Sequence, residues 1–348
     1  MRIALDAMGG DHAPNEVVAG AIEASETGIL PPGSIVLVGD RARVQACLDE
    51  AGRPYQVVED LLQDLPPADG DRFAVVHASQ VVGMDEPPAQ VLRQKRDSSM
   101  AVATALVKQG IADGIVSAGN TGAMVAFAFL QLKSLEGVRR PGIAVTIEGE
   151  DGPFVVIDVG ANIAPKPTHL LHYGVMGSTL ARDKYGKANP RVGLLNIGGE
   201  EGKGNELAKE AQELFRASGL NFHGNIEGQD VFLGVCDVIV TEGFVGNVLL
   251  KLSEGLATHL LHVVQEELVR AGVRQNVLEE SLAAIVRRTD FSEYGGALLL
   301  GIEGIVTIAH GRSKGRAIRN ALRVSVETVT LGINEKIVQE IRKLEALA

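Results

Sequence analysis

An α/β fold with a mainly parallel sheet and helices on both of its faces is predicted by two features of the sequence. Short β-branched runs such as "RIALDA" (2–7), "SIVLVG" (34–39) and "DGIVS" (113–117) alternate with longer amphipathic stretches. Several runs are continuously apolar, as expected for strands that helices cover on both faces. Strand and helix in alternation predict parallel pairing, and ligands of such sheets bind beyond the carboxyl ends of the strands.

The elements follow in chain order. Further strands are expected in five runs, "YQVVE" (55–59), "GIAVTIEG" (142–149), "PFVVIDVG" (153–160), "RVGLLNIG" (191–198) and "VCDVIVTEG" (235–243). Helices are expected over residues 15–26, 89–108, 121–134, 168–184 and 205–218. We expect residues 1–348 to form a single α/β/α catalytic domain, since no repeat or flexible linker divides the chain.

The alternation stops after Gly246, where two amphipathic helices follow one another with a break at Gly272. They predict a protruding helical hairpin over residues 247–290. Its apolar faces need a partner, and the same pair in a second subunit would serve, so the hairpin is expected to form a homodimer.

Composition narrows the class of protein. The net charge of −11 argues against a nucleic-acid binder, which is normally basic. Cys47 and Cys236 lie far apart without metal-ligand spacing, which favours small buried thiols in a reducing compartment. No signal peptide opens the chain, and "AMVAFAFLQL" (123–132) is too short to span a bilayer. We therefore expect a soluble cytoplasmic protein.

The common cofactor and nucleophile motifs are not found. The first strand is not followed by G-x-G-x-x-G, and no G-x-S-x-G or H-E-x-x-H occurs. "GGEEGKGN" (198–205) is one residue too short for a P-loop and has Gly204 where Ser or Thr would bind magnesium. His169 and His172 share one predicted helix face, and His259 and His262 share another, but neither pair has a third metal ligand at a suitable spacing. The sequence thus predicts neither a metal nor a nucleotide cofactor.

Glycine turns follow the predicted strands instead. The first is "ALDAMGGDHAPNEVV" (4–18), and the others are "SAGNTGA" (117–123), "DVGANIAPKPTHL" (158–170), "NIGGEEGKGNE" (196–206), "GNIEGQD" (224–230) and "TEGFVGN" (241–247). Backbone N–H groups in such turns, with a helix N-terminus behind them, bind anions. Because the turns share one sheet edge, they predict a site for a phosphate-sized anion.

A set of motifs in fixed order resembles the bacterial phosphate acyltransferases known as PlsX. They are "LDAMGGDHAP", "SAGNTGA", "KPTHL", "NIGGEEGKGNE", "GNIEG", "GFVGNV", "EYGGALLLG" and "IAHG". The resemblance implies a Rossmann-like α/β/α sandwich related to isopropylmalate dehydrogenases and phosphotransacetylases. It also implies a homodimer without a cofactor that moves a fatty acyl group from acyl-acyl-carrier protein to inorganic phosphate. The acyl phosphate would feed phospholipid synthesis through a glycerol-3-phosphate acyltransferase at the membrane.

Polarity and position select the candidate site residues. Lys166, Asn225 and His12 are the expected catalytic residues: Lys166 for phosphate or the oxyanion, Asn225 as a donor, His12 as a proton donor or only as a loop hydrogen bonder. The expected substrate-binding residues are Gly9, Gly10, Asp11, Asn120, Thr121, Asn162, Gly198, Gly199, Gly243 and Asn247. Asp6 and Asp11 are expected mainly to organise the first loop.

The sequence departs from the family pattern at two notable positions, and two rival functions are compatible with it. Gln229 replaces a usual arginine and Glu242 a usual aspartate. One rival is a dehydrogenase or phosphotransacetylase of the related fold, and another is a non-catalytic scaffold for acyl carriers or membranes. Three basic groups could dock an acidic carrier: residues 93–96, 287–288 and 312–319. Peripheral contact with the inner face of the membrane is also left open.

Overall fold

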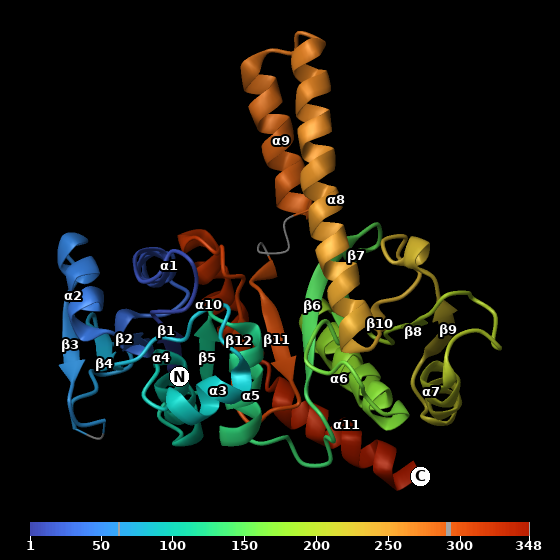
Figure 1. Ribbon diagram of the computed structural model, residues 1–348, viewed down its shortest axis with the longest axis horizontal. Helices are drawn as coiled ribbons and strands as arrows, with labels where there is room; N and C mark the ends of the chain where they lie inside the picture. Colours follow the sequence, from blue (N-terminus) through green and yellow to red (C-terminus); the bar gives the residue numbers. More distant parts are fainter. Residues whose placement is uncertain (62, 290–293, 348) are drawn as a thin grey trace. The chain divides into compact units, whose positions relative to one another are not determined.

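A computed structural model of the chain describes residues 1–61, 63–289 and 294–347. Two compact units make up the chain, Met1–Pro141 with Gly295–Ala346, and Gly142–Tyr294. Each unit carries its own strands and its own covering helices (Figure 1). The single domain expected from the sequence stays a prediction.

The first unit is built on strands in the order β3-β4-β2-β1-β5-β12-β11. All neighbours are parallel except β11 and β12. The strands are β1 (Ile3–Asp6), β2 (Ile35–Gly39), β3 (Tyr55–Val58), β4 (Phe73–His77), β5 (Gly114–Ser117), β11 (Ala297–Leu300) and β12 (Ile305–Ile308). The helices are α1 (Asn15–Glu26), α2 (Arg41–Glu50), α3 (Pro88–Gln94), α4 (Ser99–Lys108), α5 (Thr121–Gln131), α10 (Gly315–Thr330) and α11 (Ile333–Leu347), with a 3₁₀ turn, η1, at Pro32–Ser34.

The core of this unit explains why its central strands are so apolar. Ile3 and Leu5 of β1 point to the face that α1 and α10 cover, and they pack there with Val17 and Ile318. Helix α4 also packs on β1, β2 and β5. Fully buried strands of this kind need apolar residues on both faces, which is the pattern in the sequence.

The second unit has the strand order β6-β7-β10-β8-β9. Strand β6 is antiparallel to β7, and the other neighbours are parallel. Its strands are β6 (Gly142–Gly149), β7 (Gly152–Ile157), β8 (Val192–Leu195), β9 (Phe222–Ile226) and β10 (Val238–Val240). Its helices are α6 (Pro167–Tyr185), α7 (Glu206–Ala217), α8 (Gly243–Arg270) and α9 (Gln275–Thr289), with a 3₁₀ turn, η2, at Gly228–Asp230. The expected α/β class with a mostly parallel sheet is confirmed.

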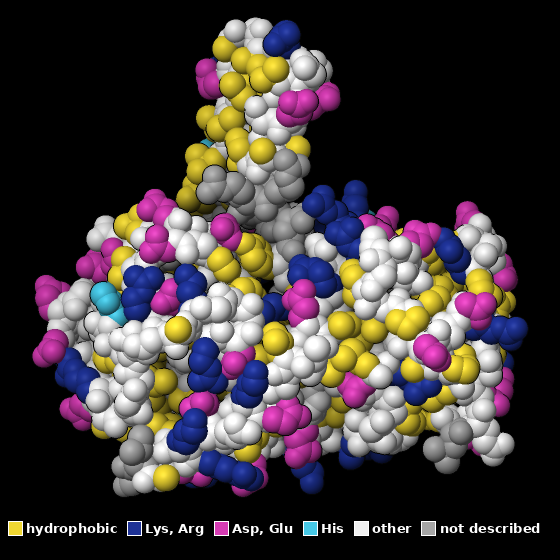
Figure 2. Space-filling view, turned by 180° about the vertical axis from the view of Figure 1, so that it is seen from behind, with side chains coloured by type: hydrophobic (Ala, Val, Ile, Leu, Met, Phe, Trp, Pro, Cys, Tyr) yellow, Lys and Arg dark blue, Asp and Glu magenta, His cyan; other side chains and the backbone are white. Residues whose placement is uncertain are grey.

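Helices α8 and α9 lie side by side and project away from the strands of the second unit (Figure 1). Large apolar side chains stand exposed along α8 at helical spacing, among them Val248, Leu252, Leu256, Leu260 and Val263. Figure 2 shows hydrophobic side chains gathered on this helical pair. No helix in the described parts of the chain is both long enough and apolar enough to cross a bilayer.

Most expected elements are found, with two corrections. The helix expected over residues 89–108 is wrong as one element, because Ser98 caps a new helix by accepting a hydrogen bond from the N–H of Ala101 at 3.3 Å. The expected turn at 224–230 begins inside β9. The sequence does not predict the strands β4, β9, β11 and β12.

The two cysteines differ in burial, and this gives a first testable prediction. Cys236 is 3% exposed, and burial raises the pKa of its thiol to about 12, whereas Cys47 is only half-buried. At pH 8 a thiol reagent is expected to modify Cys47 in the folded protein and Cys236 only after unfolding, because the thiolate is the reacting form. Mass spectrometry of labelled peptides measures both rates.

The Cys236 thiol also makes the free energy of unfolding depend on pH. Only the unfolded chain releases this proton between the ordinary thiol pKa of 9.0 and about 12, so the free energy of unfolding falls as the pH rises through that range. A Cys236→Ala variant lacks this contribution to the slope. Equal labelling of both cysteines in the folded protein would contradict the assignment.

Candidate functional site

Three loops of the first unit meet where β1, β5 and β12 end. These strands are parallel neighbours, so their carboxyl ends lie at one edge. The N–H of Asp11 donates to the carbonyl of Gly311 at 2.8 Å, which ties the first loop to the loop after β12. A Cβ on Gly9 would lie 2.7 Å from the backbone nitrogen of Gly119, so only glycine allows the first and second loops to approach this closely.

Asp6 organises the first loop from below, as expected. Its carboxylate is fully buried and accepts hydrogen bonds from the Ser117 hydroxyl at 2.7 Å and from the N–H of Met8 at 3.2 Å. Burial raises the pKa of Asp6, and these hydrogen bonds oppose that shift. The side chain thus lies beneath the loop, away from any exposed anion.

Asn120 connects the second loop to its surroundings. Its Oδ1 accepts from the N–H of Ala123 and so caps α5, while its Nδ2 donates to the carbonyls of Gly83, Met84 and Glu86 at 3.3, 2.8 and 3.0 Å. The amide is thereby used within the protein. Thr121 starts α5 with an exposed side chain, at the helix end that favours anions.

His12 follows the glycines of the first loop and has an exposed imidazole. Its carbonyl accepts from the N–H of Glu16 at 3.1 Å, which starts α1. Gly10 also lies in this loop, and its φ of 101° is one that side chains rarely adopt. The first unit therefore brings together six of the expected residues, Gly9, Gly10, Asp11, His12, Asn120 and Thr121.

In the second unit, Asp158 shapes the loop after β7. One carboxylate oxygen accepts from the N–H groups of Ile143, Gly160 and Ala161 at 2.9, 3.1 and 2.9 Å, and the other accepts from Asn162 at 2.7 Å. Burial raises the pKa of this carboxyl, and the four backbone donors oppose the shift. The role of Asp158 was not singled out from the sequence, although an Asp directly after an apolar strand was a usable signal.

This loop packs on the N-terminus of α8. The N–H of Gly243 donates to the carbonyl of Asn162 at 2.8 Å, and the Asn162 amide donates to the buried Tyr173 hydroxyl at 2.8 Å. Gly160 lies beside Asn247, whose side chain is exposed on the first turns of α8. The expected residues Asn162, Gly243 and Asn247 thus lie together.

Glu242, which departs from the family pattern, has a structural role. Its two carboxylate oxygens accept from the N–H groups of Phe244 and Val245 at 2.7 and 2.9 Å, so the side chain caps α8. Two N–H groups that could have faced an anion are therefore occupied. Gln229, the other departure of interest, lies exposed in η2 with no contact that defines a role.

Lys166 stands at the N-terminus of α6. Its backbone N–H donates to the His169 imidazole at 3.1 Å, and its side chain is exposed. Among the ion pairs of the described residues it forms none. Pro167 at the first helical position fixes this start. A free ammonium group beside a helix N-terminus suits an anionic ligand.

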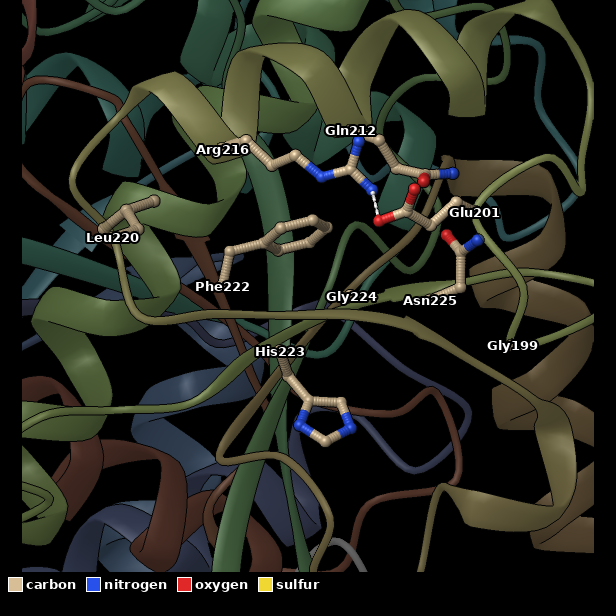
Figure 3. Close-up of a pocket in the computed structure, with 9 residues that line it drawn as sticks. All are labelled: Gly199, Glu201, Gln212, Arg216, Leu220, Phe222, His223, Gly224 and Asn225. Carbon is tan, nitrogen blue, oxygen red and sulfur yellow. Dashed lines mark ion pairs between the residues drawn. The ribbon is translucent and has the colours of Figure 1, made fainter.

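The loop after β8 and the end of β9 border a cavity of about 440 Å³ (Figure 3). Gly199 and Asn225 line it, whereas the neighbouring Gly198 is buried and does not line it. Asn225 donates its amide to the carbonyl of Glu200 at 2.9 Å. The cavity wall also includes Gln212 of α7, which sequence reasoning missed because a glutamine within an amphipathic helix gives no signal.

Among the three basic groups at 93–96, 287–288 and 312–319, the first and the third form ion pairs within the protein. Lys95 pairs with Glu86, and Arg319 pairs with Glu23 at 2.5 Å, so part of the charge at 93–96 and 312–319 is neutralised. The side chains of Arg287 and Arg288 lie outside the described residues. Docking of a carrier by any of these groups stays a prediction.

The sequence of the chain is similar to those of known proteins. A family model described as "Fatty acid synthesis protein" matches residues 1–336. This chain belongs to that family. The phosphate acyltransferase of Desulforamulus reducens is 45% identical over 338 residues, 96% of this chain and 95% of that protein. That of Aquifex aeolicus is 44% identical over 348 residues, 99% of this chain and 98% of that protein. The expected membership in the phosphate acyltransferase family, and with it the acyltransferase class, is confirmed.

Solved structures agree on the fold. A phosphotransacetylase from Streptococcus pyogenes aligns with a TM-score of 0.60 at 17% identity, covering 95% of this chain and 94% of that one. A 4-hydroxythreonine-4-phosphate dehydrogenase from Klebsiella pneumoniae aligns with a TM-score of 0.54 at 16% identity, covering 94% of this chain and 99% of that one. At these identities the likeness shows that the fold is shared with phosphotransacetylases and dehydrogenases.

Proposed function

We propose that this protein transfers a fatty acyl group from acyl-acyl-carrier protein to inorganic phosphate and releases acyl phosphate. Family membership supports acyl transfer to phosphate at the coarse level. The observation that carries the finer proposal is the set of glycine turns and helix N-termini at the carboxyl ends of the strands, with the exposed Lys166 beside one of them. Such groups suit a free phosphate.

The chemistry needs no covalent intermediate. A phosphate oxygen attacks the thioester carbonyl carbon, the C–O bond forms, the C–S bond breaks and the thiolate leaves and takes up a proton. Phosphate esters have a second pKa of about 6, a guide to a nucleophile that is already largely dianionic at neutral pH. A thiol pKa of about 8.5 makes the sulfur a good leaving group. The protein must position phosphate and stabilise the developing oxyanion.

Individual roles follow from position. Lys166 binds phosphate or the oxyanion, and Thr121 and Asn247 bind substrate at the helix starts where they lie, with Asn162 in the adjoining loop after β7. His12 has an exposed imidazole, so it can protonate the thiolate or hold the first loop. Asn120 acts by holding the loop, because its amide is used by the protein.

The test is thiol release from a long-chain acyl-acyl-carrier protein. Release is expected to rise with phosphate concentration and to saturate, because a bound phosphate is the acceptor. Sulfate, which has the same shape but is a poor nucleophile, serves as the control and should inhibit. Release at an unchanged rate without phosphate would instead indicate a thioesterase.

The apolar stripe on α8 supports a homodimer as part of this proposal. The exposed side chains from Val248 to Val263 recur at the helix spacing and form one continuous apolar face. A second copy of the same pair of helices covers such a face in a closed assembly.

A charge in the stripe tests the dimer. Leu256→Glu is expected to shift the protein to monomers, because a carboxylate placed in an apolar interface loses its hydration. Analytical ultracentrifugation measures the mass. Gln265→Glu adds the same charge at another exposed position of α8 and should leave the dimer intact. A monomeric wild-type protein would contradict the proposal.

A further inference from the structure

The cavity beside β9 has a shape that strand geometry explains. Phe222, His223, Gly224 and Asn225 are consecutive residues, and all four line it. Successive side chains of a strand point to opposite faces, so a cavity against one face would contact only alternate residues. The pairing of β9 with β8 is irregular between Phe222 and Gly224, which interrupts this alternation, and β9 is the last strand of the second unit; the cavity therefore follows the irregular part of an edge strand.

Two buried side-chain atoms on this wall lack hydrogen-bond partners among the described residues. They are Nε2 of Gln212 and Oδ1 of Asn225, and their residues are only 3% and 8% exposed. One is a donor and the other an acceptor. Their amides lie on the same side of the cavity, near the Glu201 carboxylate (Figure 3). Because unpaired buried polar groups are costly, the pair indicates a ligand that offers both an acceptor and a donor.

The opposite end of the cavity is apolar, with a charged rim. Leu220 and Phe222 line it, and the Phe222 ring stacks on Phe215 with centroids 4.9 Å apart. Arg216 of α7 pairs with Glu201 at 2.6 Å, but both side chains are largely exposed, so this ion pair is weak and can exchange partners. The cavity volume of about 440 Å³ lies in the range of small-molecule sites.

We propose that this cavity binds the pantetheine arm of the acyl donor, an inference that rests on the proposed function. The arm is a narrow chain with two secondary amides, each of which offers one N–H and one carbonyl, as the Gln212 and Asn225 pair requires. Its branched hydrocarbon end suits Leu220 and Phe222, and a phosphate beyond it meets Arg216. The thiol end then points toward Gly199, at the carboxyl end of β9 where the glycine turns lie.

The limited volume of the cavity, about 440 Å³, favours this arm over a polypeptide strand. Arg216 and Leu220 line one side of it, and Gly199 lines the other (Figure 3). An extended peptide added to the edge of β9 would have to continue past both. The arm ends at the thioester near Gly199, and the fatty acyl chain continues from there outside the cavity.

Calorimetric titration with pantetheine tests the site directly, without turnover. Wild-type protein is expected to bind pantetheine, and Gln212→Met to bind it at least about tenfold more weakly, because the donor is lost at similar volume. Gly199→Leu is expected to abolish binding by filling the cavity, since an added Cβ there meets nothing within 4 Å. Ser178→Ala removes another buried unpartnered atom elsewhere in the unit and should change nothing. Thermal unfolding verifies that each variant is folded.

Turnover separates this inference from the proposed function. With acyl-pantetheine as donor, Gln212→Met is expected to raise KM about tenfold with little change in kcat, while an acyl thioester without amides shows no such change. If phosphate-dependent turnover is normal but pantetheine does not bind, or binds the variants equally well, the cavity assignment is wrong and the proposed function stands. If pantetheine binds without any turnover, the proposed function fails instead. Stronger binding of an extended alanine peptide, lost in Gln212→Met, would assign the edge to a peptide and overturn the proposal.

Discussion

Lys166→Met is expected to lower kcat for acyl phosphate formation roughly 100-fold, the cost of removing one oxyanion donor in other enzymes. Methionine keeps most of the length of the side chain and removes its charge. Because the Lys166 side chain is exposed at the start of α6, the thermal midpoint should not change. Steady-state assays at several phosphate concentrations separate an effect on phosphate binding from an effect on the reaction step.

A matched variant controls for a general effect of removing one positive charge. Lys209→Met removes an exposed lysine of α7 in the same unit and should leave turnover within twofold of wild type. Lys166→Arg, which retains the charge, should recover part of the rate. Full turnover by a folded Lys166→Met protein would remove this residue from the catalytic set.

Gly246→Ala is expected to destabilise the protein by about 3 kcal/mol and to reduce turnover at the same time. The added Cβ would lie 1.9 Å from the carbonyl oxygen of Asp158, a backbone atom that cannot move alone. Relief requires α8 to shift away from the loop at 158–162, which holds Asn162 in place. Urea unfolding at a fixed protein concentration gives the difference in free energy.

The same helix provides the control. Gly255 also lies in α8, and a Cβ added there meets nothing within 4 Å. Gly255→Ala should therefore stabilise the protein by roughly 0.5–1 kcal/mol, the usual gain from replacing a glycine within a helix. Similar effects of both substitutions would show that helix propensity, and not contact with the Asp158 loop, governs Gly246.

Elements with strong periodicity could be predicted from the sequence almost residue by residue. Helix α1 has the expected bounds of Asn15 and Glu26, and β6 has those of Gly142 and Gly149. Both have local signals that agree with their surroundings: an amphipathic run before a glycine, and an apolar run bounded by glycines. The hairpin after Gly246 was also foreseen, because two long helices without a strand between them leave few other arrangements.

Other elements depend on contacts that are distant in the sequence. Strand β9 contains His223 and Gly224, which favour a turn, and only pairing with β8 makes the segment a strand. The break at Ser98 lies in a stretch with helical periodicity, and it becomes visible only when Asp97 is seen to accept hydrogen bonds from Ser79.

The positions of the expected site residues agree with the sequence patterns, whereas their roles stay predictions. Gly9 and Asn162 lie at strand ends as expected, since the carboxyl edge of a parallel sheet gathers such residues. The amide of Asn120, expected on a substrate, instead holds three carbonyls. Gln212 could not be predicted, because its significance comes from burial without a partner.

The central claim, transfer of the acyl group to phosphate, is tested most directly by trapping the product. The protein is incubated with long-chain acyl-acyl-carrier protein and phosphate, and hydroxylamine then converts acyl phosphate to the acyl hydroxamate. We predict one hydroxamate for each thiol released, and neither product without phosphate. Thiol release accompanied by free fatty acid, with no hydroxamate, would contradict the claim.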